Sequence, residues 1–264
     1  MSKKEELIQK WDVFLAKIEE RFNDLLAEAN ENWPLVIEQL EYDSSVISNA
    51  WNGISNQVDS LQNKIDDTWD DKMDPLFGMM DEVSGDERME QLYKGKDLDN
   101  KMSGILTQQR IKISADAGRK IYANVIAHID LNKMHACKQC SAPLAIQIYS
   151  FVAKNIKCDA CGTVNSYEPD SRIRSLEYYA MNQLAEELVI TEIVREEEIG
   201  YELWKLDARI PNEKIIVDTL SKEIVSVRKK SINTYYNYLI ENITDKATIY
   251  ENQKIERLKW AEKV

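Results

Sequence analysis

The stretch HACKQCSAPLAIQIYSFVAKNIKCDACGTVNSYEPD, residues 135–170, contains all four cysteines of the 264-residue chain. Cys137 and Cys140 form one CxxC pair, Cys158 and Cys161 form a second, and seventeen residues lie between the pairs. Each CxxC places two sulfurs on one tight turn, or knuckle, and two knuckles can complete a tetrahedron around Zn²⁺. The spacing therefore predicts a structural zinc site with these four thiolates as its ligands.

The residues between the two pairs have the pattern of short β-strands. Leu144, Ile146 and Ile148 alternate with Ala, Gln and Tyr, which is the period of two expected of a half-buried strand. Residues 151–157 form the predicted return strand. Gly162 follows the second pair directly and suits the positive φ that a knuckle often requires. We therefore expect a small inserted β ribbon.

Within this stretch, CKQCSAPL and CDACGTVN resemble the opening and the closing of the zinc-ribbon group, with Ser141 where glycine is common. The resemblance covers about 35 of the 264 residues and implies metal binding. It implies little about function, because zinc ribbons occur in transcription factors, ribosomal proteins, enzymes and protein adaptors.

Disulfides or a redox-active CxxC would use the same cysteines. Disulfides need an oxidising compartment, and no signal peptide is evident that would send the chain there. A redox CxxC begins a helix within a βαβ unit, and no such pattern surrounds either pair. His135, two residues before Cys137, could replace or support a ligand, although a flanking polar role is the simpler expectation.

No catalytic constellation stands out in the sequence. Four thiolates leave a zinc ion no open position for water, and His128 and His135 are the only histidines. There is no HExxH motif, no Cys–His pair at a convincing spacing and no Ser-His-Asp constellation. We therefore expect a protein that is not an enzyme and has no catalytic residues.

The composition favours long helices in a water-soluble chain, since only 8 glycines and 5 prolines interrupt a sequence that is 44% hydrophobic and 30% charged. No apolar stretch approaches the roughly 18 to 20 residues that cross a bilayer, so no membrane insertion is expected. A cytoplasmic location agrees with reduced thiols and the missing signal peptide.

The formal net charge of −12 is unevenly distributed. Residues 1–97 carry 23 acidic and 10 basic side chains, whereas residues 98–170 carry 6 and 9. An acidic surface repels phosphate backbones, so nucleic acid is an unlikely partner for the whole molecule. A local contact through the mildly basic middle segment stays open.

Apolar residues at helical spacing predict one helix over residues 3–31 and another over residues 47–69, with a break at Trp33-Pro34. Ser2 and Glu5 form a capping-box pattern at the start of the first helix. The second stripe is close to a heptad, which predicts coiled-coil-like packing and permits self-association into a homo-oligomer. The two stripes consist of Leu7, Trp11, Phe14, Ile18, Phe22, Leu25 and Ala29, and of Ile47, Trp51, Ile54, Val58, Leu61, Ile65 and Trp69.

An acidic run, Asp66 to Asp74, ends the second stripe. Asp67, Asp70, Asp71 and Asp74 are spaced to share one helix face, and the run lacks the loop pattern and the glycine of an EF-hand. This pattern has two interpretations, a solvated helix face or a docking surface for a basic protein partner.

The remaining segments continue the helical pattern. Residues 75–97 hold three glycines and a proline and are expected to be an irregular connection or a short helix, with Phe77, Met79 and Met80 either anchoring a partner or covering the end of a bundle. Further helices are predicted over residues 98–133, over residues 171–207 with a cap at Ser171, over residues 211–241, and from Thr244 to the C-terminus.

Together these patterns predict a mainly α fold, an elongated helical bundle of coiled-coil-like hairpins with a small inserted β zinc ribbon. The predicted domains are an acidic helical hairpin over residues 1–97, a helical body over residues 98–134 and 171–264, and the ribbon over residues 135–170. The leading functional hypothesis is a non-enzymatic, zinc-stabilised adaptor, scaffold or assembly subunit that binds other proteins. A nucleic-acid-associated zinc-ribbon factor and, less favoured, a metal-dependent enzyme with a carboxylate site are the alternatives.

Overall fold

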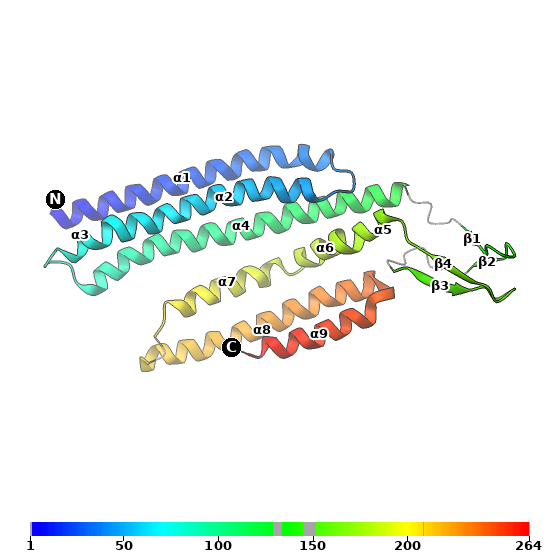
Figure 1. The fold of residues 1–264 in the computed structure, drawn as a ribbon. Helices are drawn as coiled ribbons and strands as arrows, with labels where there is room; N and C mark the ends of the chain where they lie inside the picture. Colours follow the sequence, from blue (N-terminus) through cyan, green and yellow to red (C-terminus); the bar gives the residue numbers. More distant parts are fainter. Residues whose placement is uncertain (1, 129–133, 145–151, 208, 264) are drawn as a thin grey trace. The chain divides into compact units, whose positions relative to one another are not determined.

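The computed structural model describes residues 2–128, 134–144, 152–207 and 209–263, and these residues form a mainly α-helical fold with small β-sheets, as the sequence predicts (Figure 1). The chain divides into two compact units. Unit 1 comprises Met1–Val36 and Ser45–Arg110, and unit 2 comprises Ile37–Ser44 and Ile111–Val264. Within the described residues, no helix combines the length and the apolar character that a bilayer span requires.

Unit 1 is a bundle of α1 (Lys3–Glu38), α2 (Ser45–Thr68) and the first part of α4 (Gly85–His128), which run side by side (Figure 1). A π-helical turn, Trp69–Met73, joins α2 to the short helix α3 (Asp74–Gly78). The two stripes predicted from the sequence supply most of the core, whose buried members from these stripes are Leu7, Trp11, Ile18, Phe22, Leu25, Val58, Leu61, Ile65 and Trp69.

Trp11 lies within this core and is fully buried. Its indole Nε1 donates a hydrogen bond to the carbonyl oxygen of Gln91 over 2.9 Å, and its ring stacks on Phe14 with the centroids 5.4 Å apart. Gly95 makes room for the indole, because a Cβ at position 95 would lie 2.9 Å from Cζ2 of Trp11 and 3.0 Å from Cγ2 of Ile65. The close approach of α4 to α1 therefore depends on glycine at this position.

The predicted break at Trp33-Pro34 is wrong, because α1 continues to Glu38 with Pro34 inside it. A proline inside a helix removes one backbone hydrogen bond and strains the preceding turn. Burial of the neighbouring Trp33, whose ring lies 6.2 Å from that of Trp51, offsets part of this cost.

Two helices of unit 1 begin with capping boxes. At the start of α1, the N–H of Ser2 donates to Glu5 and the N–H of Glu5 donates to Ser2 Oγ, at 2.8 and 3.2 Å, as predicted. At the start of α4, Ser84 and Glu87 make the same reciprocal pair at 3.0 and 3.2 Å. The second box was missed, and it lets the helix begin at Gly85, inside a segment predicted to be irregular.

Of the three apolar residues expected to anchor a partner or to cover the end of a bundle, Phe77 is buried in the unit 1 core and Met80 packs against it. Met79 is exposed. Phe77 and Met80 therefore close the core of unit 1.

Unit 2 contains the rest of α4, then α5 (Ser171–Ser175), a π-helical turn (Leu176–Met181), α6 (Asn182–Glu187), α7 (Ile190–Trp204), α8 (Pro211–Asn242), a 3₁₀ turn (Thr244–Lys246) and α9 (Ala247–Ala261). The helix α8 packs against α6, α7 and α9. Pro211 opens α8 as predicted, but the single helix expected over residues 171–207 is divided, and Asp170, not Ser171, caps its start by accepting from the N–H of Arg172.

A buried ion pair lies at the π-helical turn of unit 2. The carboxylate of Glu177 is almost inaccessible, pairs with the ammonium group of Lys246, and accepts a hydrogen bond of 3.2 Å from the hydroxyl of Tyr250. Opposite this turn, Gly118 of α4 allows close packing, because a Cβ there would lie 3.2 Å from the carbonyl oxygen of Ala180. The turn is thus fixed by both polar and steric contacts.

The inserted segment forms two antiparallel two-stranded sheets. The strand β1 (His135–Ala136) pairs with β2 (Pro143–Leu144), and β3 (Lys154–Lys157) pairs with β4 (Val164–Tyr167). The predicted alternation at Ile146 and Ile148 and the start of the return strand at Phe151 lie outside the described residues, as does Ile129 of the predicted third helix.

Candidate metal centre

The first knuckle is a tight turn closed by two backbone hydrogen bonds. The N–H of Cys137 donates to the carbonyl oxygen of Ala142 over 2.8 Å, and the N–H of Ser141 donates to that of Cys137 over 2.9 Å. Ser141 has φ +61°, a left-handed backbone conformation that residues other than Gly, Asn and Asp rarely adopt. The turn takes the knuckle shape despite the serine.

The second knuckle repeats this geometry. The N–H of Cys158 donates to the carbonyl oxygen of Thr163 over 2.9 Å, and the N–H of Gly162 donates to that of Cys158 over 2.8 Å. Gly162 has φ +75°, as the sequence predicts. The two turns therefore present their cysteines in the same way.

The two knuckles bring the four predicted sulfurs together, all within 4.8 Å of one another. Sγ of Cys137 lies 3.7 Å from that of Cys161, and Sγ of Cys140 lies 3.6 Å from that of Cys158. A regular tetrahedron with Zn–S bonds of about 2.3 Å places its sulfurs about 3.8 Å apart. The residues present therefore fit a single tetrahedral metal ion, with Cys137 and Cys158 buried and Cys140 and Cys161 facing the exterior.

The same distances argue against the disulfide alternative, because bonded sulfurs lie about 2.05 Å apart. All four cysteines are free. Neither CxxC pair begins a helix, since Cys137 and Cys140 lie between β1 and β2 and the second pair lies between β3 and β4. The helix start on which a redox CxxC depends is missing from these described turns.

Backbone donors already favour a negative charge in the sulfur cluster. The N–H groups of Cys140 and Gln139 point at the Cys137 sulfur and lower the pKa of that thiol to about 6. At Cys140 the N–H of Ala142 acts in the same direction, but the neighbouring sulfurs, Cys161 first, raise the pKa to about 12. A divalent cation among the sulfurs would remove this repulsion and stabilise the thiolate form of every member.

Asn165 on β4 supports the cluster and was not identified from the sequence. Its side chain is buried, with Oδ1 accepting from the N–H of Lys138 over 2.9 Å and Nδ2 donating to Sγ of Cys137 over 3.5 Å and to the carbonyl oxygen of Thr163 over 3.1 Å. One amide thus joins the first knuckle to the second. Its position five residues before the helix cap Asp170 carries no recognisable motif, so only the fold reveals it.

The two histidines lie outside the sulfur cluster. His135 on β1 packs edge-on against Tyr167, with the ring centroids 5.0 Å apart, and it does not belong to the group of metal-ligating side chains. Nδ1 of His128 lies 2.8 Å from the carbonyl oxygen of Asn124, and its ring packs against Tyr42. His135 therefore takes the flanking place that was the simpler expectation.

Among the described residues, the cysteine cluster is the one group of three or more Cys, His, Asp or Glu side chains placed to hold a metal ion. The acidic run does not form such a group. Asp66 pairs with Lys96, Asp74 pairs with Arg88, and the π-helical turn at Trp69–Met73 interrupts the regular helical spacing on which a shared face depends. Comparison with protein-family models, with curated proteins and with solved structures found no match to this chain.

Proposed function

We propose that the protein is a non-enzymatic adaptor or assembly subunit whose ribbon is held by one structural zinc ion. The observation that carries the proposal is the cluster of four cysteine sulfurs within 4.8 Å of one another. Four thiolates complete the coordination shell of zinc, so no position remains at which water or substrate could bind. The ion would then stabilise the fold of the ribbon and supply no catalytic group.

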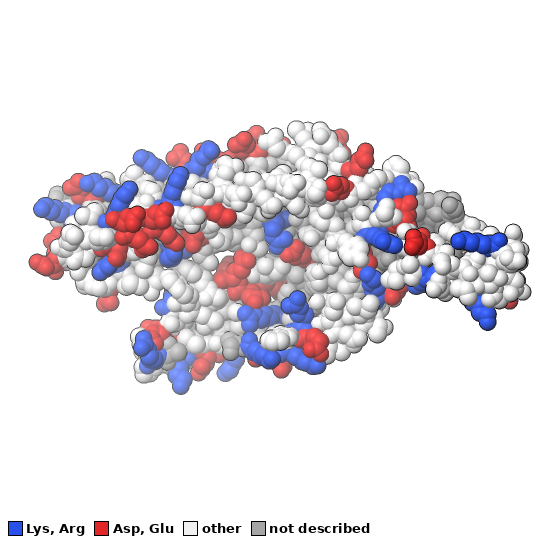
Figure 2. Space-filling model, viewed as in Figure 1, with Lys and Arg blue, Asp and Glu red and all other residues white. Residues whose placement is uncertain are grey.

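The acidic run gives this adaptor a candidate docking surface for a basic protein. Acidic side chains gather over the part of unit 1 formed by the end of α2 and the start of α4 (Figure 2). The internal cations Lys96 and Arg88 pair with two of the five aspartates. The other three, Asp67, Asp70 and Asp71, are exposed. Their charges are available to a partner rich in Lys and Arg, with an attraction that salt would screen.

The experiment is an affinity capture from the native host followed by binding measurements with the captured partner at low and high salt. We expect the triple variant D67N/D70N/D71N to bind the partner more weakly than the wild type, with a smaller salt dependence. The matched control is E20Q/D24N/E31Q, which removes three exposed carboxylates from α1 of the same unit. Equal losses in both variants, or none in either, would contradict docking at the acidic run.

Exposed lysines on the ribbon are the observation that favours the second candidate, a nucleic-acid-associated factor. Lys138, Lys154 and Lys157 all face solvent in or beside the small sheets. Contacts with phosphates through these lysines require an affinity that falls steeply with salt. A gel-shift assay at low salt tests this candidate, which is rejected if the zinc-loaded protein leaves the mobility of single- and double-stranded probes unchanged.

A further inference from the structure

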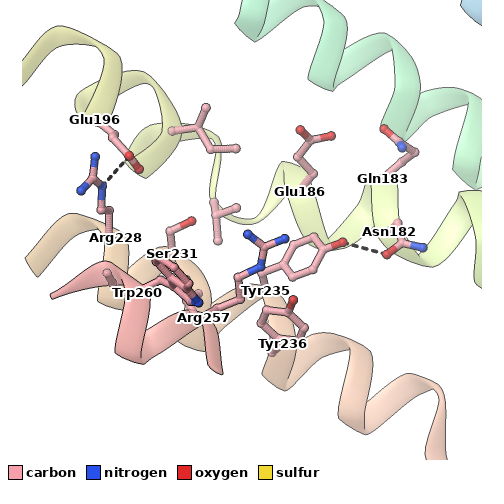
Figure 3. A pocket seen from close by; sticks show the side chains of 14 residues that line it. Asn182, Gln183, Glu186, Glu196, Arg228, Ser231, Tyr235, Tyr236, Arg257 and Trp260 are labelled. Atoms are coloured by element: carbon pink, nitrogen blue, oxygen red, sulfur yellow. Dashed lines mark hydrogen bonds and ion pairs between the residues drawn. The ribbon is translucent and has the colours of Figure 1, made fainter. Parts of the chain in front are cut away.

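A cavity of about 690 Å³ lies in unit 2 among α6, α7, α8 and α9 (Figure 3), and no cysteine lines it. Its volume falls within the range of about 300 to 1,000 Å³ typical of small-molecule sites. A second hollow of about 470 Å³ shares Tyr236, Arg257 and Trp260 with it. The proposed adaptor function makes no use of either space.

One wall of the cavity is held in place by a short chain of hydrogen bonds. The hydroxyl of Tyr235 donates to Oδ1 of Asn182 over 2.7 Å, and Nδ2 of Asn182 donates to the carbonyl oxygen of Glu177 over 2.6 Å. Burial, with smaller contributions from Tyr236 and Glu186, raises the pKa of Tyr235 to about 12, so its phenol is neutral at physiological pH. These hydrogen bonds orient Tyr235 and Asn182 before a ligand binds, whereas Oε1 of Gln183, which also lines the cavity, is buried without a hydrogen-bond partner among the described residues.

Four charged side chains line the cavity, namely the carboxylates of Glu186 and Glu196 and the guanidinium groups of Arg228 and Arg257. Arg228 donates from Nε to Glu196 over 2.6 Å, which joins α8 to α7 and neutralises that carboxylate (Figure 3). Arg257 on α9 lines the same space, and within the described part of the chain it makes no ion pair or hydrogen bond. A guanidinium without a carboxylate partner attracts an anionic group, and its fork of donors matches carboxylate or phosphate oxygens.

Aromatic rings flank this free guanidinium. Trp260, one turn after Arg257 on α9, is 63% exposed, although an indole in water is costly for a folded protein. Tyr235 and Tyr236 pack edge to face with their centroids 5.2 Å apart and add two more rings to the lining. Nζ of Lys263 lies over the Trp260 ring, 3.8 Å from its centroid, so a planar group that stacks on this indole would displace the ammonium group or use the opposite face.

We propose that this cavity is a binding site for a planar aromatic molecule that carries a carboxylate or a phosphate group. The anion binds to Arg257, and the aromatic group lies against Trp260 and the paired tyrosines. The two anionic groups share the same recognition chemistry, so the structure assigns the class of ligand and the experiment distinguishes its members.

Isothermal titration of the zinc-loaded 264-residue chain tests the site with two anionic probes, AMP and indole-3-acetate. Their uncharged counterparts, adenosine and indole-3-ethanol, measure the contribution of the negative charge. We expect at least one anionic probe to bind and its counterpart to bind at least about tenfold more weakly, the effect of losing one charge-assisted hydrogen bond. Binding of AMP alone would identify phosphate as the preferred group, and binding of indole-3-acetate alone would identify carboxylate.

The variant R257Q should lower the affinity for the anionic probe about tenfold and leave the weak binding of the uncharged counterpart unchanged. The variant W260A should weaken both. The matched control K259Q removes a cation from an exposed position of α9 that does not line the cavity. The proposal is overturned if neither anionic probe binds, if charged and uncharged probes bind equally, or if R257Q and K259Q have the same effect.

Discussion

Ser141 and Gly162 occupy equivalent positions in the two knuckles, and both have left-handed backbone conformations, with φ +61° and +75°. A side chain costs roughly 1 to 2 kcal/mol in this conformation, and glycine adopts it freely. We expect S141G to stabilise the zinc-bound ribbon by about 1 kcal/mol, after the greater flexibility of glycine in the unfolded chain is subtracted. Competition with a chromogenic chelator should show zinc held about fivefold more tightly.

The reciprocal variant, G162A, should weaken zinc retention in the same assay by about 1 to 2 kcal/mol. A Cβ at position 162 would meet only the flexible end of Lys157, at 3.8 Å, so the expected loss comes from backbone strain and not from a clash. If S141G and G162A change zinc retention in the same direction, the left-handed turns do not limit the stability of the ribbon.

Removal of the metal should unfold the ribbon and leave the helices largely intact. We expect the purified protein to contain about one zinc ion per chain and C158S to lose it, because three thiolates leave the tetrahedral shell incomplete. Elemental analysis measures the zinc content, and circular dichroism of the wild type and of C158S measures the helix content. H135N is the control, since the His135 ring packs on Tyr167, and it should keep its zinc.

Asn165 should affect metal affinity without being a ligand. N165A removes the hydrogen bond to Sγ of Cys137 and the bond to the N–H of Lys138, so zinc affinity should fall roughly 10 to 100-fold. The control S166A removes an exposed hydroxyl that donates to Oδ1 of Asn155, on the same strand pair. An N165A protein that competes for zinc as well as S166A does would show that this amide has no influence on the metal site.

Replacing either of two glycines of α4 by alanine should change the free energy of unfolding, in opposite directions at the two positions. G95A places a Cβ 2.9 Å from the ring of Trp11 and should lower the free energy of unfolding by about 1 to 3 kcal/mol. G104A places its new methyl group at least 4 Å from every described atom outside the adjoining helix backbone, and it should raise the free energy of unfolding by up to about 1 kcal/mol, the helix propensity of alanine over glycine. Urea denaturation of the two variants measures both changes.

Removing only one partner of the ion pair between Lys246 and Glu177 should strongly lower the free energy of unfolding. K246M leaves a buried carboxylate without its cation and should destabilise the protein by about 3 to 5 kcal/mol. The double variant E177L/K246M removes both charges and should recover part of this loss. K259M is the control, because both partners of the Lys259–Glu256 pair are mostly exposed, and its effect in thermal unfolding should be below about 1 kcal/mol.

The sequence was sufficient to predict the helical class, the ribbon and the sulfur cluster because each follows from a local pattern. The stripe that includes Trp11 and Phe22 has helical spacing, and its large side chains have to be buried. The CxxC spacing likewise determines where two sulfurs lie, whatever surrounds them. Local rules therefore account for most elements and for all four candidate ligands.

The errors arose where packing overrides local preference. Gly95 is one of the three glycines for which residues 75–97 were expected to be irregular, yet it lies inside α4, where the Trp11 ring occupies the space of its missing side chain. Pro34 was read as a break, although burial of Trp33 carries the helix beyond it. Asn165 and Arg257 could not be identified at all, since their roles depend on partners or cavities that only the folded chain creates.

The division of the chain into two units determines which contiguous fragments contain a complete unit. The backbone passes between the two units three times, after Val36, after Ser44 and after Arg110, and the first and the last of these crossings lie within the continuous helices α1 and α4. Neither unit is one uninterrupted length of polypeptide. A contiguous gene fragment that encodes all of unit 1 therefore also encodes Ile37–Ser44 of unit 2, and one that encodes all of unit 2 includes Ser45–Arg110 of unit 1.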